Sequence, residues 1–438
     1  MNSRKKAEQI FISGVKSVTP EKLISRSMSV KGSVLKICDL SFSLDVIRNI
    51  FVIGAGKASA AMGHYVENIL GNRITEGHIV VKYGYSCKLK RIKVTEAGHP
   101  VPDLNGIMAT QEILRIARHA SENDLVICLI SGGGSALLTD LPEGCLPEEL
   151  FIVNHLLIRS GASINEINTV RKHLSDVKGG QLVKAVWPAT LVSLILSDVP
   201  GNSLEVVASG PTAPDSTTFG EAVKVLENYQ LTNDITVPIL NYLKEGERGI
   251  RPETLKPGDP LFNKTFNILA GTNLIALEEA KKAAIDLGFN TIIIESEMQG
   301  YVENLAQNIV DTALNYKNNN EIKKPVCLLY GGEPTIKVTG EGLGGRNQHL
   351  ALSAAIKLRD LPGITFLSAG TDGTDGSTQA AGAVVDADTV HMALSINADP
   401  EKYLDEFDSF NFFKLTGGHI ITGPTLTNVM DLVVVIVE

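Results

Sequence analysis

The chain has 438 residues, of which 44% are hydrophobic and 20% charged, and its 40 Lys and Arg against 49 Asp and Glu give a net charge of −9. This apolar content excludes a chain that is disordered throughout. The acidic net charge argues against nucleic-acid or membrane-surface partners, because proteins that bind them usually carry a surplus of basic residues. Since one core rarely extends beyond roughly 250–300 residues, the length predicts two domains.

Short apolar runs alternate with stretches of helical periodicity, which predicts a mostly parallel sheet flanked by helices. In the first half we expect strands over residues 50–53, 78–82, 91–95, 125–130 and 190–196. Helical periodicity covers residues 57–70 and 107–119, and Ser163 followed by Glu166 has the pattern of a capping box that starts a further helix.

A break in this alternation spans residues 245–260, which combine charges with three prolines and three glycines. Beyond it we expect strands over residues 265–270, 291–294, 326–330, 364–368 and 432–437, with helices over 273–287, 302–316 and 347–358. We therefore predict an N-terminal domain over residues 1–255 and a C-terminal domain over 256–438, with the last strand pairing in either one.

The cysteines number five and are scattered, without the spacing of a disulfide framework or a metal finger. This usage fits reduced thiols in the cytoplasm. No apolar stretch approaches the roughly 18 residues of a membrane span, and the basic residues 4–6 are not followed by the apolar segment of a signal peptide. We expect a soluble cytoplasmic protein that acts on small molecules.

A glycine-rich turn with Gly54 and Gly56 follows the first expected strand, at the sheet edge where open α/β sheets bind ligands. A dinucleotide fingerprint would need glycine in place of Ser59 and an acidic residue near Lys82, and the Walker A pattern also fails here. The turn is therefore glycine-rich without matching a standard cofactor motif.

Lys57 in this turn is expected on the first turn of a helix, where its charge opposes the positive end of the helix dipole. A bound phosphate or carboxylate would reverse that effect. The alternative is a solvated lysine that lies over the helix surface.

A second glycine loop, from Ser131 to Ser135, follows the strand over residues 125–130. Gly132, Gly133 and Gly134 would let the backbone approach an anion closely, while the two serine hydroxyls add donors. The loop suits an oxyanion of unspecified identity, or it is a tight turn between a strand and a helix.

Asp198 stands just past the strand over residues 190–196, with Ser197 between them. A carboxylate at this place can hold Mg²⁺, bind its coordinated water or take a proton from an attacking hydroxyl. Capping of the Pro-Gly turn that follows is an equally good interpretation.

In the second half, Glu333 follows a strand, and a glycine loop leads through Arg346 and Asn347 into a helix. Arg346 repeats the unfavourable placement of Lys57, and its planar guanidinium suits phosphate or carboxylate oxygens. The alternative is an exposed arginine paired with Glu341.

Asp372 and Asp375 stand three residues apart after another strand, without the pattern of a calcium-binding loop. They could bind a nucleotide-associated cation, or they could form turns and cap a helix. His99 and His173 are lone histidines, for which a structural role is the more common one.

Ten blocks of this sequence together resemble the glycerate 2-kinase family of the MOFRL type, over nearly the whole chain. They are GAGKAS (54–59), GHPVPD (98–103), SGGGSALL (131–138), INTVRKHLSDVKGGQL (167–182), LSDVPGN (196–202), ASGPTAPD (208–215), YGGEPT (330–335), GGRNQ (344–348), AGTDGTDG (369–376) and TGPTLTNVMDL (422–432).

The resemblance implies phosphorylation of D-glycerate at its 2-hydroxyl by ATP with Mg²⁺, giving 2-phosphoglycerate and ADP. It also implies a Rossmann-like, mostly parallel three-layer α/β domain, a smaller α/β domain of the MOFRL type, and an active site in the cleft between them. Lys57 and Arg346 match residues associated with catalysis in that family.

We expect Lys57 and Arg346 to act on the transferring phosphoryl group and the glycerate carboxylate, and Asp198 to orient the glycerate hydroxyl or a Mg²⁺-bound water. Asp198 and Asp375 are the candidate magnesium ligands. The expected contacts to substrate or nucleotide are Gly54, Gly56, Ser131, Gly132, Gly133, Gly134, Ser135, Glu333, Asn347 and Asp372.

Two other functions stay open at this point. A hydroxypyruvate reductase would need NAD(P)H, yet no acidic ribose-binding residue follows the first glycine loop. A phosphosugar-binding regulator would need one anion site and no catalysis. The sequence does not fix the oligomeric state, a homodimer included.

Overall fold

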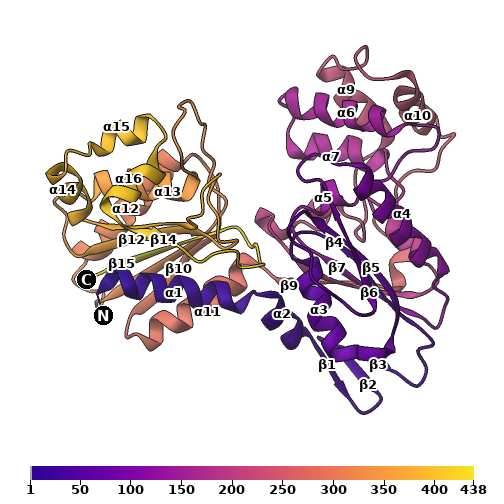
Figure 1. The fold of residues 1–438 in the computed structure, drawn as a ribbon, viewed down its shortest axis with the longest axis horizontal. Helices are drawn as coiled ribbons and strands as arrows, with labels where there is room; N and C mark the ends of the chain where they lie inside the picture. The colour runs from indigo at the N-terminus through magenta and orange to yellow at the C-terminus, as the bar shows by residue number, and fades with distance from the viewer. Residues whose placement is uncertain (1) are drawn as a thin grey trace. The chain divides into compact units, whose positions relative to one another are not determined.

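The computed structural model describes residues 2–438 and divides the chain into two compact units, each described here by itself (Figure 1). Leu23–Ala270 form the first, which we call the parallel-sheet unit. Gly271–Glu438, together with the residues up to Lys22, form the second, which we call the mixed-sheet unit. The division differs from the expected one at residue 255 because a strand that ends at Gly271 still belongs to the first sheet.

The six-stranded sheet of the parallel-sheet unit has the order β6-β5-β4-β7-β8-β9. Its strands are β4 (Ile50–Ala55), β5 (Ile74–Lys82), β6 (Ile92–Ala97), β7 (Leu125–Ile130), β8 (Thr190–Leu196) and β9 (Thr265–Gly271). Neighbours from β6 to β8 run parallel. Every residue of β4 and β7 is buried, as expected for central strands of a parallel sheet covered on both faces.

Two helices cover opposite faces of this sheet. Gly63 of α3 (Ser59–Leu70) packs against Ile79, whereas α4 (Leu104–His119) shares a core with Val80. Successive residues of a strand point to opposite faces, so the unit has the expected three layers. The remaining short helices here are α5 (Gly134–Leu137), α8 (Gln181–Val186), η1 (Gly71–Arg73), η2 (Pro200–Asn202), η3 (Val207–Ser209) and η4 (Pro260–Lys264).

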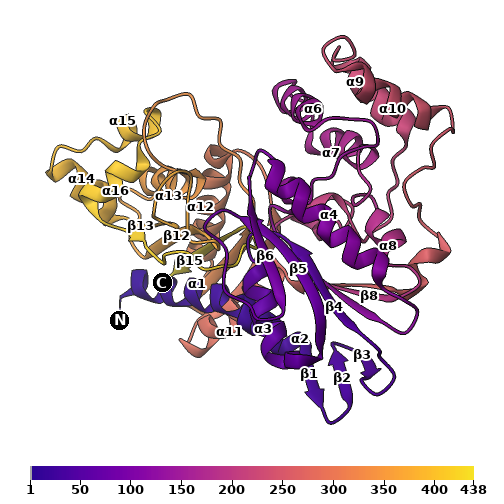
Figure 2. The same cartoon turned by 45° about the vertical axis from the view of Figure 1, so that its right-hand side comes forward.

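Two additions to this unit lie outside the sheet. Strands β1 (Met28–Lys31), β2 (Val34–Ile37) and β3 (Leu40–Ser43) form a small antiparallel sheet after α2 (Pro20–Ser27). The second addition is a helical lobe made of α6 (Pro147–Arg159), α7 (Ile164–His173), α9 (Phe219–Asn228) and α10 (Val237–Glu247). This helical lobe has a hydrophobic core of its own, and Figures 1 and 2 both show its helices gathered together.

The mixed-sheet unit has a six-stranded sheet of order β10-β11-β15-β12-β13-β14. Its strands are β10 (Asn290–Met298), β11 (Val326–Gly332), β12 (Ile364–Gly370), β13 (Gly382–Asp386), β14 (His419–Ile420) and β15 (Asp431–Val437). The last strand, expected in either domain, lies at the centre of this sheet and runs antiparallel to both β11 and β12.

Helices cover both faces of the mixed sheet. Gly14 of α1 (Ser3–Ser17) packs against Ala280 of α11 (Asn273–Asp286) and against Leu432 of β15, and α1 lies along α11 in Figures 1 and 2. The other helices are α12 (Val302–Asn318), α13 (Arg346–Lys357), α14 (Asp388–Ser395), α15 (Pro400–Asp405) and α16 (Ser409–Thr416). The amino-terminal helix therefore belongs to the mixed-sheet unit instead of the first domain.

Within residues 2–438, no helix combines the length and apolar character that crossing a membrane requires. All five cysteines are free thiols, as expected.

Candidate active site

The first two glycine loops lie together at the switch point of the parallel sheet, where the order of the strands reverses between β4 and β7. β4 and β7 are neighbours, with Ala55 opposite Ile130, while the strands that follow β4 in the chain lie on its other side. Open α/β sheets bind ligands at the carboxyl edge beside such a switch point. The loop after β4 and the loop after β7 both leave the sheet at this edge.

Hydrogen bonds join the two loops directly. The Lys57 amide donates to the Gly132 carbonyl at 2.9 Å, and the Ala58 amide donates to Ser131 Oγ at 3.0 Å. The Ser131 hydroxyl also lies 3.1 Å from Ser59 Oγ. Ser131 is therefore buried between the loops and serves their packing.

Several glycines here are required by close approach. A Cβ on Gly54 would overlap Leu129, and one on Gly56, whose φ is +132°, would overlap Ser131. Gly133 has a φ of +88° and faces the His99 ring, which a Cβ would meet at 3.0 Å. These close contacts explain why glycine is required at each position. Because glycine has no side chain, the loop backbone is not covered by side chains of its own.

Lys57 lies in a turn before the helix, because α3 begins at Ser59 and the Ser59 amide closes a turn onto the Gly56 carbonyl. The expectation that Lys57 occupies the first helical turn is wrong by two residues. The helix dipole acts within the first turn, so it opposes this charge less than expected. The Lys57 side chain extends beside Gly133, 3.6 Å from the position of a Cβ there.

Asp198 follows β8 and lies against the second glycine loop. A Cβ on Gly132 would stand 2.8 Å from Asp198 Cγ, so the carboxylate occupies the space that a side chain at Gly132 would take. The structure thus brings Asp198, Lys57 and the loop from Ser131 to Ser135 to one edge of the sheet.

A strained segment packs against this loop; it lies in the block ASGPTAPD (208–215), although none of its residues was expected as a site residue. Ala208 and Ser209 have φ values of +51° and +61°, and Gly210 follows at +61°. Non-glycine residues in this region carry strain that recurs at functional sites. Ala208 packs on Gly134, and Ser209 Oγ lies 3.0 Å from Ser135 Oγ. The only sequence signal was the ASGP string itself.

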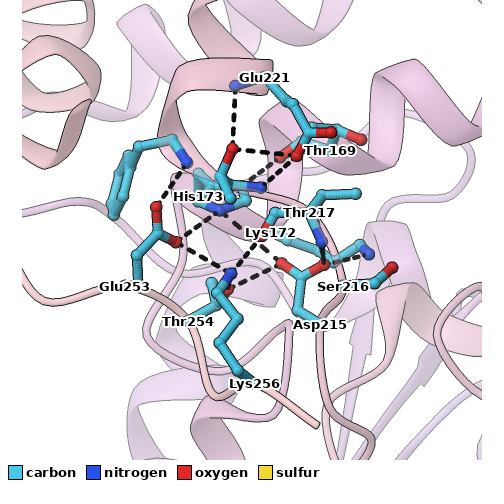
Figure 3. A network of polar contacts seen from close by, with 12 residues as sticks. Thr169, Lys172, His173, Asp215, Ser216, Thr217, Glu221, Glu253, Thr254 and Lys256 are labelled. Atoms are coloured by element: carbon cyan, nitrogen blue, oxygen red, sulfur yellow. Dashed lines mark hydrogen bonds and ion pairs between the residues drawn. The ribbon is translucent and has the colours of Figure 1, made fainter.

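A largely buried polar network connects α7 to other segments of the parallel-sheet unit (Figure 3). Lys172 Nζ donates to Asp215 Oδ1 at 2.7 Å, and Thr254 Oγ1 donates to Asp215 Oδ2 at 2.9 Å. Burial raises the pKa of Asp215, but the hydrogen bonds from Lys172 and Thr217 outweigh burial and leave the pKa below its ordinary value. His173 contributes to the same network, which supports a structural role for this lone histidine.

His173 Nε2 lies 3.2 Å from Glu253 Oε2, and Nδ1 lies 2.7 Å from the Thr169 carbonyl. The network thus ties α7 to the segments around residues 215 and 253, which are distant in sequence. On the neighbouring turn of α7, Asn168 Oδ1 lies 3.1 Å from Ser209 Oγ. The network therefore stabilises the position of α7, the helix that contacts Ser209 of the strained segment.

In the mixed-sheet unit, Arg346 is the first residue of α13 and is bound by two carboxylates. Its Nε and Nη2 donate to Asp431 at 2.6 and 3.1 Å, and Nη1 donates to Glu333 Oε1 at 2.6 Å. Burial lowers the pKa of Arg346, but these carboxylates outweigh burial and raise it above its ordinary value. The alternative partner Glu341 is not the one found, and Asp431 was not among the expected site residues.

Asp375 and Asn347 have internal roles that differ from the expected ones. The Asp375 carboxylate accepts hydrogen bonds from the Asn347 and Gln348 amides at 3.0 and 2.8 Å, and so caps α13. Burial raises the pKa of Asp375 to about 6, although these amides oppose the shift. Asn347 is buried, and its Oδ1 accepts from Ser368 at 2.6 Å. Both side chains thus form hydrogen bonds within this unit, and their contacts with a ligand stay a prediction.

Asp372 forms a turn in which the Thr374 amide donates to Oδ1 at 3.0 Å. It lies near the Arg346 cluster, because a Cβ on Gly370 would stand 3.3 Å from Asp372 Oδ1 and 3.4 Å from Asp431 Oδ1. The structure therefore groups the expected residues into two sets, one in each unit.

Comparison with known proteins identifies the family. Residues 6–244 match a domain of unknown function, DUF4147, and residues 326–431 match the MOFRL family. A D-glycerate 2-kinase of Thermotoga maritima is 40% identical, covering 98% of this chain and 97% of the relative. A putative hydroxypyruvate reductase of Agrobacterium vitis is 38% identical, over 87% of this chain and 85% of the relative.

The fold agrees with these matches. The crystal structure of a glycerate kinase from Thermotoga maritima aligns with a TM-score of 0.88 at 38% identity, covering 99% of both chains. The chain therefore belongs to the MOFRL-type glycerate 2-kinase family.

Proposed function

We propose that the protein phosphorylates D-glycerate at its 2-hydroxyl with ATP, giving 2-phosphoglycerate and ADP. Membership of the glycerate 2-kinase family supports glycerate as the acceptor. The observation that supports phosphoryl transfer is that Lys57, Asp198 and the glycine loop from Ser131 to Ser135 lie together at the switch point of the parallel sheet. Phosphoryl transfer depends mainly on positioning and charge neutralisation, which are the properties that such an arrangement offers.

In this reaction the 2-hydroxyl oxygen forms a bond to the γ-phosphorus of ATP, and the bond from that phosphorus to the bridging oxygen breaks, releasing ADP. Asp198 accepts the hydrogen bond of the 2-hydroxyl and receives its proton. Lys57 neutralises charge on the transferring group. Asp198, His99 and Ala208 fill the Cβ positions of the glycines from 132 to 134, so in this proposal phosphate contacts the loop through backbone N–H groups.

Arg346 keeps a proposed role in binding an oxyanion. A guanidinium has five N–H donors, and the three hydrogen bonds to Asp431 and Glu333 use three of them. Two N–H groups therefore remain for phosphate or carboxylate oxygens. In this proposal Glu333 and Asp431 orient the guanidinium.

The residues present suit Mg²⁺ only as a partner of phosphate. Within residues 2–438 no three His, Cys, Asp or Glu side chains gather closely enough to hold a metal ion. Mg²⁺ in phosphotransferases commonly uses one or two carboxylates together with substrate phosphates, and Asp198 fits that pattern. Asp375 does not fit, since amides of α13 occupy its oxygens. When bound, Mg²⁺ would neutralise phosphate charge.

A coupled assay tests this function. With D-glycerate, ATP and MgCl₂, we expect ADP release that requires both substrates. A reductase would instead oxidise NADH in the presence of hydroxypyruvate, and a binding regulator would bind a ligand without consuming ATP. NADH oxidation without ADP release would refute the proposal.

A further inference from the structure

A small cavity lies in the parallel-sheet unit, where the helical lobe meets the end of the second glycine loop. It has a volume of about 20 Å³. A void of roughly 10–15 Å³ holds one water molecule, so this one has space for one or two atoms of the size of a water oxygen. The polar residues of its lining that matter here are Ser135, Asp140, Asn154, Arg171 and Lys178.

Arg171 supplies a positive charge to this cavity that no carboxylate of the described residues balances. Its Nε donates to Asn154 Oδ1 at 2.7 Å, and Asn154 is a neutral amide. Among residues 2–438, no Asp or Glu oxygen lies within the 4.0 Å of an ion pair to Arg171. Burial lowers the pKa of its guanidinium, which is the direction expected for a charge taken from water without a counter-ion.

The other two charges at the cavity largely offset each other. Lys178 Nζ donates to the Leu138 carbonyl and attracts the carboxylate of Asp140. Asp140 accepts hydrogen bonds from Ser175 Oγ at 2.5 Å and from the Asp176 amide. Burial lowers the pKa of Lys178 to about 8, and the charge of Arg171 acts in the same direction. The cluster therefore carries one positive charge in excess.

A partly buried cation without a counter-ion is unfavourable in the empty protein, and an anion in the cavity would remove that cost. The cavity is far too small for a triphosphate, whereas each oxygen of a carboxylate is about the size of a water molecule. Ser135, which lines it, belongs to the loop whose Gly132 packs against Asp198.

We propose that Arg171 binds the carboxylate of the acceptor substrate, and that Asn154 is a positioning residue that orients its guanidinium. The proposal rests on the proposed glycerate kinase function and adds the subsite for the acid group. The 2-hydroxyl carbon is bonded directly to the carboxylate carbon, so a carboxylate held beside Ser135 keeps the 2-hydroxyl nearer to the loop than the 3-hydroxyl.

Arg171→Gln tests the subsite, with Arg159→Gln as the control, because Arg159 is an exposed arginine of the same helical lobe. We expect the KM for D-glycerate to rise on the order of 10- to 100-fold in Arg171→Gln, the range for a lost hydrogen bond between charged groups, while the KM for ATP stays within about twofold. The control should match the wild type. Arg171→Lys, which keeps the charge without the planar fork, should fall between the two.

A stability measurement separates this role from a structural one. Without substrate, Arg171→Gln should have a melting temperature equal to or above that of the wild type, because an uncompensated charge is removed. D-glycerate should raise the melting temperature of the wild type and not that of the variant. An unstable variant without substrate, or an unchanged KM for glycerate, would overturn the proposal.

These readouts distinguish two failures. A wild-type protein that consumes no ATP with glycerate refutes the proposed function. Stabilisation by D-glycerate that requires Arg171 would still support the carboxylate subsite, and equal stabilisation of both proteins would refute it.

Discussion

The carboxylate of Asp198 packs against the bare Cα of Gly132, where a Cβ would stand 2.8 Å from Asp198 Cγ. The loop after β7 and Asp198, the second residue after β8, thus pack closely against each other. Gly132 has no positive φ, so an alanine there is excluded by contact with Asp198 and not by backbone strain.

Gly132→Ala should therefore displace Asp198. We expect a fall in turnover of about 100-fold, a typical contribution of general acid–base groups, and a loss of stability of about 1–3 kcal/mol from overpacking. Gly220→Ala in α9 is the matched control, since the nearest atom to its Cβ is 3.9 Å away. Steady-state kinetics and chemical denaturation measure both quantities, and wild-type turnover in Gly132→Ala would contradict the role of Asp198.

His99 should remain neutral across the physiological range. Burial, followed by the charges of Lys57 and Lys82, lowers its pKa from 6.5 to about 4. Between about pH 4 and 6.5 the His99 imidazole is protonated in the unfolded chain and neutral in the folded protein. The free energy of unfolding should therefore rise as the pH increases over this range. His99→Gln should flatten the pH dependence in that window.

NMR titration of the imidazole measures this pKa directly. In Lys57→Met the pKa of His99 should rise, while staying below 6.5 because burial persists. An unchanged value in Lys57→Met would show that the two side chains do not interact.

The two carboxylates around Arg346 should contribute unequally. Asp431 is 2% exposed and forms two hydrogen bonds, whereas Glu333 is 41% exposed and forms one. Asp431→Asn should destabilise the protein by about 2–3 kcal/mol because it leaves a partly buried cation half paired. Glu333→Gln should destabilise it less, since solvent screens that pair. Denaturation midpoints in the reverse order would be inconsistent with this geometry.

Glu253 should stabilise the fold in a pH-dependent way. Burial raises its pKa, but hydrogen bonds from His173, the Phe219 amide and Lys256 outweigh burial and lower it from 4.5 to about 2. Its contribution is thus complete above about pH 4.5 and declines as the pH falls toward 2. The stability difference between wild type and Glu253→Gln should shrink over that interval in urea titrations. A difference that does not vary with pH would mean that Glu253 acts without its charge.

The sheet strands could be predicted because central strands buried on both faces appear as continuous apolar runs, as in β7 and β15. Apart from α7, the helices of the helical lobe are not among the elements expected from the sequence, although Thr218 and Glu221 form a capping box at the start of α9. The four-residue strands β1 to β3 are too short for an alternating pattern to stand out. The place of β15 depends on pairing across distant segments, which no local pattern encodes.

In the candidate site, too, features that depend on local sequence could be predicted and features that depend on contacts between distant residues could not. The glycine loops and Asp198 could be predicted because each lies just past a strand of the sheet. The pairing of Arg346 with Asp431 could not, since the two residues are 85 positions apart and meet only because β15 lies beside β11. α3 begins at Ser59, after a turn in which Gly56 has a positive φ, and that conformation is not visible in the sequence.

The most direct measurement of the central claim is phosphorus NMR of the product formed from D-glycerate and ATP by the wild type and by Lys57→Met, with circular dichroism to show that both are folded. We expect the wild type to form 2-phosphoglycerate and ADP, and Lys57→Met to form neither at a comparable rate. Phosphate on the 3-oxygen, or undiminished turnover in the folded Lys57→Met variant, would contradict the claim.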